Sequence, residues 1–128
     1  MRGIALNSRE PVYEQVMNHF KVLIANGELR PGDEVPSRRE LARAFKINPN
    51  TVQRAYKEME EAQLIHTERN FPSRVTTDKM ILKQVREELL THAVDTFVES
   101  VQMIQIPVEE VLSLIKMRFN HLEKGDEQ

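Results

Sequence analysis

Hydrophobic residues recur at helical spacing near the start of the chain and predict a first helix from about Pro11 to Asn26. Proline is favoured at the first position of a helix, and Gly27 offers a C-terminal cap. A turn is expected at Pro31-Gly32-Asp33. The apolar stripe of the predicted helix consists of Val12, Val16, Phe20, Leu23 and Ile24.

Two short helices with explicit start signals are predicted next. Residues 37–40 read Ser-Arg-Arg-Glu, which matches the capping box and places a helix start at Arg38. After a turn at residues 46–48, Asn48 supplies an N-cap oxygen and Pro49 begins a third helix. The residues expected to be buried are Leu41 and Ala42 with Phe45 in the second helix, and Val52, Ala55, Tyr56 and Met59 in the third.

A short β-hairpin is predicted after the third helix. Residues 64–68 and 74–77 are rich in β-branched side chains and flank a connecting segment at residues 69–73. The connection contains no glycine, and Phe71-Pro72 is not a tight hairpin signal. This hairpin would form the wing of a winged helix-turn-helix.

Long helical patterns fill the rest of the chain. A helix from about Thr77 carries an apolar arc that is too wide for one neighbouring surface, and Pro107 opens a last helix. Because two helices alone bury little, we expect them to form a hairpin that pairs with the same hairpin of a second chain. The predicted dimer contacts are Leu89, Val94, Phe97, Val101, Ile115 and Phe119.

The predicted fold is therefore mainly α with a small β-hairpin, in two domains. Residues 1–76 would form a winged helix-turn-helix, and residues 77–128 a helical dimerisation module. The net charge of the chain is -2, but residues 1–75 carry +2 and residues 76–128 carry -4. The sharpest excess is +5, between Arg38 and Lys57. Such a cluster can attract phosphate, although charge alone favours an ordinary solvated helical face.

The exposed face of the third helix favours nucleic-acid binding over an ordinary solvated face as the role of this basic cluster. Asn and Gln can pair with adenine and Arg with guanine when a helix end enters the major groove, while surrounding basic residues hold phosphates. At the start of the second helix, Arg38 and Arg39 are placed for phosphate or base contact. Arg69 in the wing loop and Arg74 after it are predicted to contact phosphate or the minor groove. The residues predicted to contact DNA in and around the third helix are Asn48, Asn50, Thr51, Gln53, Arg54 and Lys57.

Other function classes receive little support from the sequence. The chain has no cysteine, no apolar run approaching ~20 residues and no secretory leader at its start, so we expect no membrane contact. These features are compatible with a reducing cytoplasm, and the expected cytoplasmic location rests on the predicted function. Ser37 and Glu40 form a capping pair and not a catalytic one, so no enzyme activity and no cofactor are expected. A regulatory metal held by His92, Asp95 and His121 stays an alternative, with surface polar residues favoured. Tyr13 and Tyr56 are expected to make core or subunit contacts.

The sequence resembles the GntR family of bacterial transcription regulators, and within it the short YtrA-like subgroup. This resemblance implies a winged-helix DNA-binding domain and a two-helix dimerisation module, acting as a repressor in most members. YtrA-like proteins are often associated with ABC-transporter operons. The family's arginine after the Pro-Ser pair looks like Arg39, and its groove-reading positions look like residues 48–54. The resemblance rests on the ordered segments PVYEQV (11–16), GELRPGD (27–33), PSRRELA (36–42), NPNTVQRAY (48–56) and LI (64–65).

The prediction is a homodimeric, sequence-specific repressor that binds a pseudo-palindromic double-stranded DNA operator. The sequence leaves the operator, the regulated genes and any small-molecule effector open. The wing departs from the family pattern, because residues 70–73 replace the usual glycine-rich tip. A competing hypothesis is a protein-interaction adaptor whose helical tail docks a partner and whose helix-turn-helix is only structural.

Overall fold

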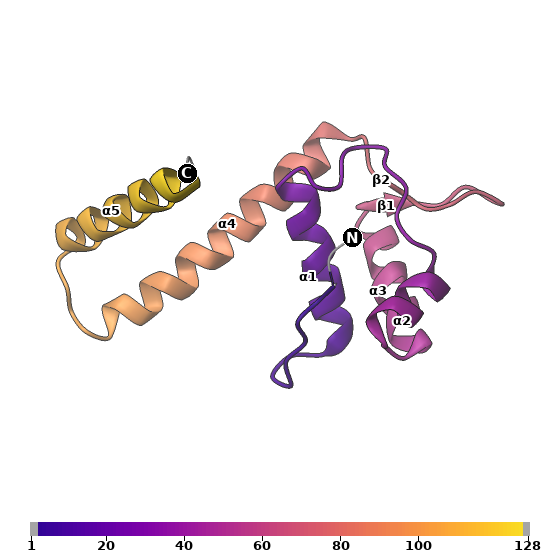
Figure 1. The fold of residues 1–128 in the computed structure, drawn as a ribbon, viewed down its shortest axis with the longest axis horizontal. Helices are drawn as coiled ribbons and strands as arrows, with labels where there is room; N and C mark the ends of the chain where they lie inside the picture. The colour runs from indigo at the N-terminus through magenta and orange to yellow at the C-terminus, as the bar shows by residue number, and fades with distance from the viewer. Residues whose placement is uncertain (1–2, 127–128) are drawn as a thin grey trace. The chain divides into compact units, whose positions relative to one another are not determined.

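The computed structural model describes residues 3–126, and they form five helices and one two-stranded antiparallel sheet (Figure 1). Contacts divide the chain into two compact units that meet between Leu90 and Thr91, inside α4. No helix in residues 3–126 is long and apolar enough to cross a membrane. In chain order the elements are α1 (Val12–Ala25), α2 (Arg38–Phe45), α3 (Pro49–Glu61), β1 (Ile65–His66), β2 (Arg74–Val75), α4 (Lys79–Gln102) and α5 (Val108–Asp126).

The core of the first unit lies where α1 and α2 pack on α3. Phe20 of α1 and Tyr56 of α3 are fully buried and meet edge to face, with their ring centroids 5.9 Å apart. The predicted stripe of α3 is buried, as are Leu41 and Ala42 of α2, while the predicted stripe of α1 is buried except for the half-buried Val12. Phe45 is only half-buried, because it is the last residue of α2 and packs at the edge of the cluster. The prediction that Phe45 is a core residue was therefore partly wrong.

Side-chain caps begin α2 and α3 where the sequence predicted. The Ser37 hydroxyl accepts a hydrogen bond from the Glu40 amide at 3.1 Å, and the Asn48 side chain accepts one from the Asn50 amide at 2.8 Å. Between the helices, Lys46 adopts a left-handed conformation with φ 56°, which ends α2. The next amide, that of Ile47, then bonds back to the Ala42 carbonyl and its side chain is buried. These contacts fix the turn between the two helices.

The predicted hairpin is present, although each of its strands has only two residues. Ile65 pairs with Val75 and His66 with Arg74, and a further bridge joins Arg74 to Glu34. In the connecting segment, Asn70 takes the left-handed conformation, with φ 68°, that a tip glycine would otherwise supply. The wing is defined here as residues 65–75, and it is anchored to the segment that precedes α2.

The start of α4 belongs to the first unit. Val85 is buried in the first unit's core, and Ile81, Leu82 and Leu89 are half-buried against it. The sequence placed the domain boundary at residues 76–77, whereas the compact units divide fourteen residues later, after Leu90. The first turns of α4 therefore complete the core around the helix-turn-helix.

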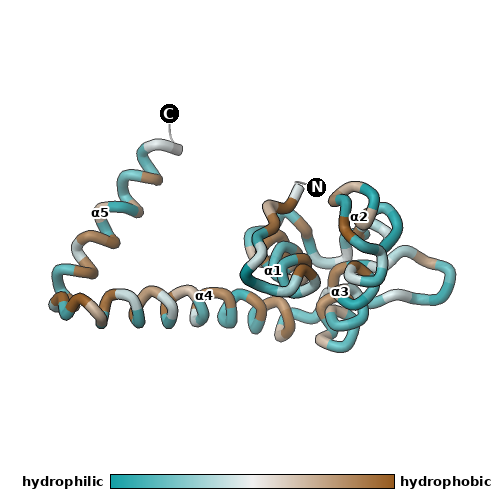
Figure 2. The backbone as a smooth tube through the Cα atoms, turned by 90° about the horizontal axis from the view of Figure 1, so that it is seen from below, coloured by the Kyte–Doolittle hydropathy of each residue, from teal (hydrophilic) through white to brown (hydrophobic). Residues whose placement is uncertain are grey.

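The second unit contains the end of α4, a turn at residues 103–107, and α5. Pro107 precedes α5 as expected, and its carbonyl accepts hydrogen bonds from the amides of Glu110 and Val111. The helix runs through Gly125 to Asp126, slightly past the predicted end. Hydrophobic positions recur along both helices (Figure 2), yet no side chain in residues 91–125 is fully buried. Within this unit, the apolar side chains of a single chain therefore form a surface and do not enclose a buried core.

Candidate nucleic-acid interface

The predicted reading face of α3 is exposed to solvent. We define it as Asn50, Gln53, Arg54 and Lys57, all of which lie on the side opposite the buried stripe of the helix. Thr51 is half-buried, and the Asn48 side chain is used as the N-cap, so these two residues help to form the helix end. Four side chains that carry donors or acceptors thus project from one face of a helix whose other face is fixed in the core.

An open groove runs between the first turns of α2 and α3, beside the reading face. Three arginines, Arg38, Arg39 and Arg43, line its α2 side, and Asn50 and Gln53 line its α3 side. Arg39 and Arg43 are exposed. Arg43 was absent from the predicted contact residues although it lies in the basic run, because a position on α2 says little about which groove it faces. The arrangement concentrates positive charge next to the base-reading side chains.

Arg54 is held by contacts within the protein. Its guanidinium lies 3.8 Å from the centroid of the Tyr13 ring, and its Nε is 3.4 Å from a Glu58 carboxylate oxygen. Its side chain nevertheless remains 60% exposed. Tyr13 is therefore a platform for an arginine from α3, a contact that the helical stripe of α1 did not reveal. Such stacking limits the orientations of the guanidinium.

Arg38 is more firmly engaged than Arg39. One of its terminal nitrogens lies 2.7 Å from a Glu60 carboxylate oxygen, and its guanidinium stands 5.1 Å from the Tyr56 ring centroid. The Arg38 Nε is buried and has no hydrogen-bond partner among residues 3–126. Arg38 remains a predicted DNA contact, but in this structure its charge is already paired.

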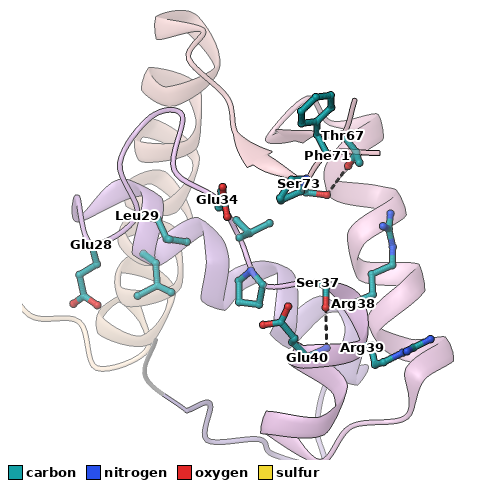
Figure 3. A pocket seen from close by; sticks show the side chains of 14 residues that line it. Glu28, Leu29, Glu34, Ser37, Arg38, Arg39, Glu40, Thr67, Phe71 and Ser73 are labelled. Atoms are coloured by element: carbon teal, nitrogen blue, oxygen red, sulfur yellow. Dashed lines mark hydrogen bonds between the residues drawn. The ribbon is translucent and has the colours of Figure 1, made fainter. Parts of the chain in front are cut away.

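The two wing arginines occupy different environments. Arg74 donates to the Gly32 carbonyl and to a Glu34 carboxylate oxygen, each at 2.9 Å, so it ties β2 to the loop before α2. Arg69 is exposed in the connecting segment. Figure 3 shows the hollow between the wing and the start of α2, with Arg38 and Arg39 on one wall and Phe71 on the other. The wing and the helix-turn-helix thus share one concave surface.

Other kinds of site find little basis in the part of the chain that the structure describes. No three His, Cys, Asp or Glu side chains within residues 3–126 come close enough together to hold a metal ion. Burial raises the pKa of the Tyr56 hydroxyl well above its ordinary value, so this group stays protonated. It donates to the Pro36 carbonyl at 2.6 Å. That bond is structural and joins α3 to the residue before the α2 cap.

Comparison with known proteins identifies the family. The model for "Bacterial regulatory proteins, gntR family" matches residues 12–75, which is half of the chain and includes α1, the helix-turn-helix and the wing. The chain belongs to the GntR family. The resemblance predicted from the sequence is thereby confirmed.

Relatives of this GntR protein include short regulators of similar length. The HTH-type transcriptional regulator YhcF of Bacillus subtilis (strain 168) is 33% identical over 85% of this chain and 90% of its own. The HTH-type transcriptional repressor YtrA of the same organism is 48% identical over 47% of this chain and 46% of its own. A GntR family transcriptional regulator from Listeria monocytogenes matches with a TM-score of 0.82 at 29% identity, over 88% of this chain and 98% of that one.

Membership of the GntR family makes this protein a DNA-binding transcriptional regulator and not an enzyme. The structural neighbour covers nearly the whole chain, which confirms the fold of a winged helix-turn-helix followed by two helices. The individual DNA contacts and the dimer contacts stay predictions.

Proposed function

We propose that this GntR protein is a cytoplasmic, homodimeric, sequence-specific repressor that presents two α3 helices to a pseudo-palindromic operator. The observation that carries the proposal is the exposed reading face on a buried recognition helix. The Asn48 cap and the buried Tyr56 fix the backbone of α3, from which the side chains of the reading face project. A helix placed in this way contacts base edges with its N-terminal half, and a dimer contacts two half-sites about one helical turn apart.

The exposed apolar surface of the second unit supports the dimer. Phe97 is 42% exposed and Phe119 62%, in a segment in which no residue is fully buried. A surface of this kind is stabilised when it is removed from water. A second copy is the partner we propose, because its identical helices offer apolar stripes of the same length. Of the other predicted contacts, Leu89, Val101 and Ile115 are half-buried and Val94 is exposed.

Phosphate contacts should give binding a steep salt dependence. We assign phosphate contacts to four of the exposed basic side chains of each protomer, namely Arg39, Arg43, Lys57 and Arg69. A dimer that places all of them on phosphates would make about eight contacts and would have a log–log salt slope of roughly -7. The overall charge of -2 does not oppose this, since the acidic excess lies in the tail.

The direction of regulation is proposed from the relatives. YtrA of Bacillus subtilis carries the name of a transcriptional repressor, and it is 48% identical over the part that it shares with this chain. A protein that covers an operator near a promoter represses by excluding polymerase. The YtrA-like resemblance makes the upstream DNA of an ABC-transporter operon the first natural sequence to test.

The test is selection of duplexes from a random pool by the full-length protein, followed by binding measurements from about 50 to 200 mM salt. We expect an enriched site with two related half-sites, one protein dimer per duplex, and affinity that falls about a thousandfold or more across this range. Equal affinity for a scrambled duplex of the same composition would refute sequence-specific binding. A single bound protomer would refute the dimer and would favour a tail that docks another protein.

A further inference from the structure

A chain of polar contacts joins the helix-turn-helix to the wing. One carboxylate oxygen of Glu60, in the last turn of α3, lies 2.7 Å from an Arg38 nitrogen and accepts a hydrogen bond from the Thr67 hydroxyl at 3.0 Å. The Thr67 hydroxyl also bonds to the Ser73 hydroxyl across the wing. We call Arg38, Glu60, Thr67 and Ser73 the polar clamp. It connects the first residue of α2, the end of α3 and both sides of the wing.

The clamp is buried or half-buried at its two ends, whereas Thr67 between them is exposed. Ser73 is buried, and its carbonyl accepts the Val35 amide at 2.9 Å, so it is fixed to the segment that precedes α2. At the other end the side chains of Arg38 and Glu60 are each only about one-third exposed, at 32% and 33%. Figure 3 shows Arg38 extending from α2 toward the Thr67–Ser73 hydrogen bond. Hydrogen bonds to charged groups in such partly buried settings are stronger than those between neutral groups.

Arg74 and backbone hydrogen bonds hold the base of the wing to residues 32–35, whereas the Thr67–Glu60 bond ties the wing to α3 through side chains. The strands have only two residues each, and Asn70, Phe71 and Pro72 beyond them are exposed. A short hairpin is marginally stable by itself. Since Thr67 follows β1 directly and Ser73 precedes β2, a bond from this pair to Glu60 restrains the hairpin where it leaves the domain.

We propose that Glu60 and Thr67 are positioning residues, which hold the wing at the angle to α3 that lets both contact one DNA duplex. The proposal rests on the proposed function, because it concerns how the wing residue Arg69 reaches DNA. Glu60 itself contacts no DNA in this scheme. The Glu60 carboxylate alone would repel phosphate, but Arg38 neutralises its charge. The role of this acidic residue is therefore to position its neighbours.

Matched variants of the full-length protein separate this role from a general loss of stability. Thr67→Val removes the hydroxyl with little change of shape, whereas Thr67→Ser keeps the hydroxyl. Glu60→Gln keeps an acceptor oxygen and removes the charge, and Glu61→Gln removes the same charge from an exposed neighbour. The two glutamine variants should change long-range attraction for DNA equally, so any difference between them reports the clamp.

The first measurement is amide hydrogen exchange of the free protein. We expect Thr67→Val to increase exchange at the Val75 and Thr76 amides roughly tenfold, with the Ala55 amide in α3 unchanged. Thr67→Ser and Glu61→Gln should match the wild type, and Glu60→Gln should lie between. Unchanged exchange at the wing in Thr67→Val would overturn the proposal, and so would equal acceleration throughout the first unit.

The second measurement is hydroxyl-radical footprinting on a duplex that the wild type recovers from a random pool. The backbone positions protected by the wing are those that Arg69→Ala exposes. We expect Thr67→Val to expose the same positions and to weaken binding up to tenfold, while Thr67→Ser retains them. The proposal would be overturned if Arg69→Ala exposed no backbone position, or if Thr67→Val left every wild-type position protected. If the wild type recovers no duplex, the proposed function fails, and the clamp is judged by exchange alone.

Discussion

Two basic side chains of the reading face, Arg54 and Lys57, differ in how firmly the protein holds them. The Arg54 guanidinium is stacked on Tyr13 and contacts Glu58, so its planar donors have a defined orientation. Lys57 is exposed one turn farther along α3 and presents a mobile point charge. A bidentate arginine can discriminate guanine from other bases, whereas a lysine near the backbone attracts any phosphate.

This difference predicts distinct effects of two substitutions on DNA binding. Arg54→Ala should cost about 1–3 kcal/mol on the selected operator and relax the preference at one base pair of each half-site. Lys57→Ala should weaken binding evenly across sequences and reduce the salt slope by about 1 per protomer. The measurement is affinity for a series of operators with single base-pair changes. An even loss in Arg54→Ala together with a position-specific loss in Lys57→Ala would reverse the two assignments.

Tyr56 illustrates a side chain whose role is stability. Tyr56→Phe removes the 2.6 Å bond to the Pro36 carbonyl and should lower the free energy of unfolding by about 1 kcal/mol. Burial also raises the pKa of this hydroxyl in the folded state. Tyr56 therefore ionises first in the unfolded chain, and stability is lost as the pH rises above the ordinary tyrosine pKa of 10.0.

Urea denaturation from pH 8 to 11 checks both effects. The wild type should lose more stability than Tyr56→Phe as the pH rises through 10. The control is Tyr13→Phe, because the Tyr13 hydroxyl bonds to the exposed Glu14 and the ring of the variant still supports Arg54. Equal loss of stability in Tyr13→Phe and Tyr56→Phe near neutral pH would contradict the structural role of the Tyr56 hydroxyl.

At the scale of elements, the two wing arginines differ, because Arg74 helps to attach the wing to the loop before α2 and Arg69 is exposed. Arg74→Ala removes two bonds from β2 to the loop before α2. Because the Arg74 side chain is 46% exposed, solvent screening limits the expected loss to about 1 kcal/mol. Arg69→Ala should leave stability within about 0.5 kcal/mol and instead lower DNA affinity and its salt slope.

Thermal denaturation and DNA titration of the same two variants measure these effects. Each variant loses one positive charge from the wing, so the pair is matched for long-range electrostatics. If Arg69→Ala lowered the free energy of unfolding as much as Arg74→Ala, Arg69 would also be a structural residue. If DNA affinity and its salt slope were unchanged in Arg69→Ala, Arg69 of the wing would not contact DNA.

The elements that the sequence predicted well are those with local signals. Ser37 and Asn48 are cap residues, and a cap acts within three positions of itself, so the starts of α2 and α3 are readable from adjacent letters. The buried stripe of α3 follows from helical periodicity. Asn70 explains why the wing forms without glycine, because asparagine tolerates the left-handed conformation.

The features that the sequence did not reveal are contacts between distant residues. Arg38 and Glu60 are 22 positions apart, and nothing in either segment indicates that they meet. Periodicity assigns Arg38 to an exposed face but does not say which neighbour neutralises it. The extent of the first unit was missed for the same reason, since Val85 is buried in a core that is built mainly by the elements before α4.

At the scale of the whole molecule, the proposed dimer would give the second unit its role. Its helices carry apolar residues on an acidic background, and none of the residues 91–125 is fully buried. A lone recognition helix reads few base pairs, whereas two linked copies read two half-sites with the second binding step made intramolecular. Such linkage raises affinity 10²–10⁴-fold without new contacts. In the proposed dimer, the tail would therefore set how tightly the two helix-turn-helix units bind one operator.

Phe97→Glu tests this dependence by placing a charge in the centre of the proposed dimer surface. We expect sedimentation to show a monomer at micromolar concentration and operator affinity to fall about a hundredfold or more. Affinity for an isolated half-site should change little, because the first unit is untouched. The control is Val22→Glu on α1, which adds the same charge at a side chain of similar exposure, 43% against 42%. A Phe97→Glu protein that remains dimeric, or a control that dissociates equally, would show that these helices do not form the dimer contact.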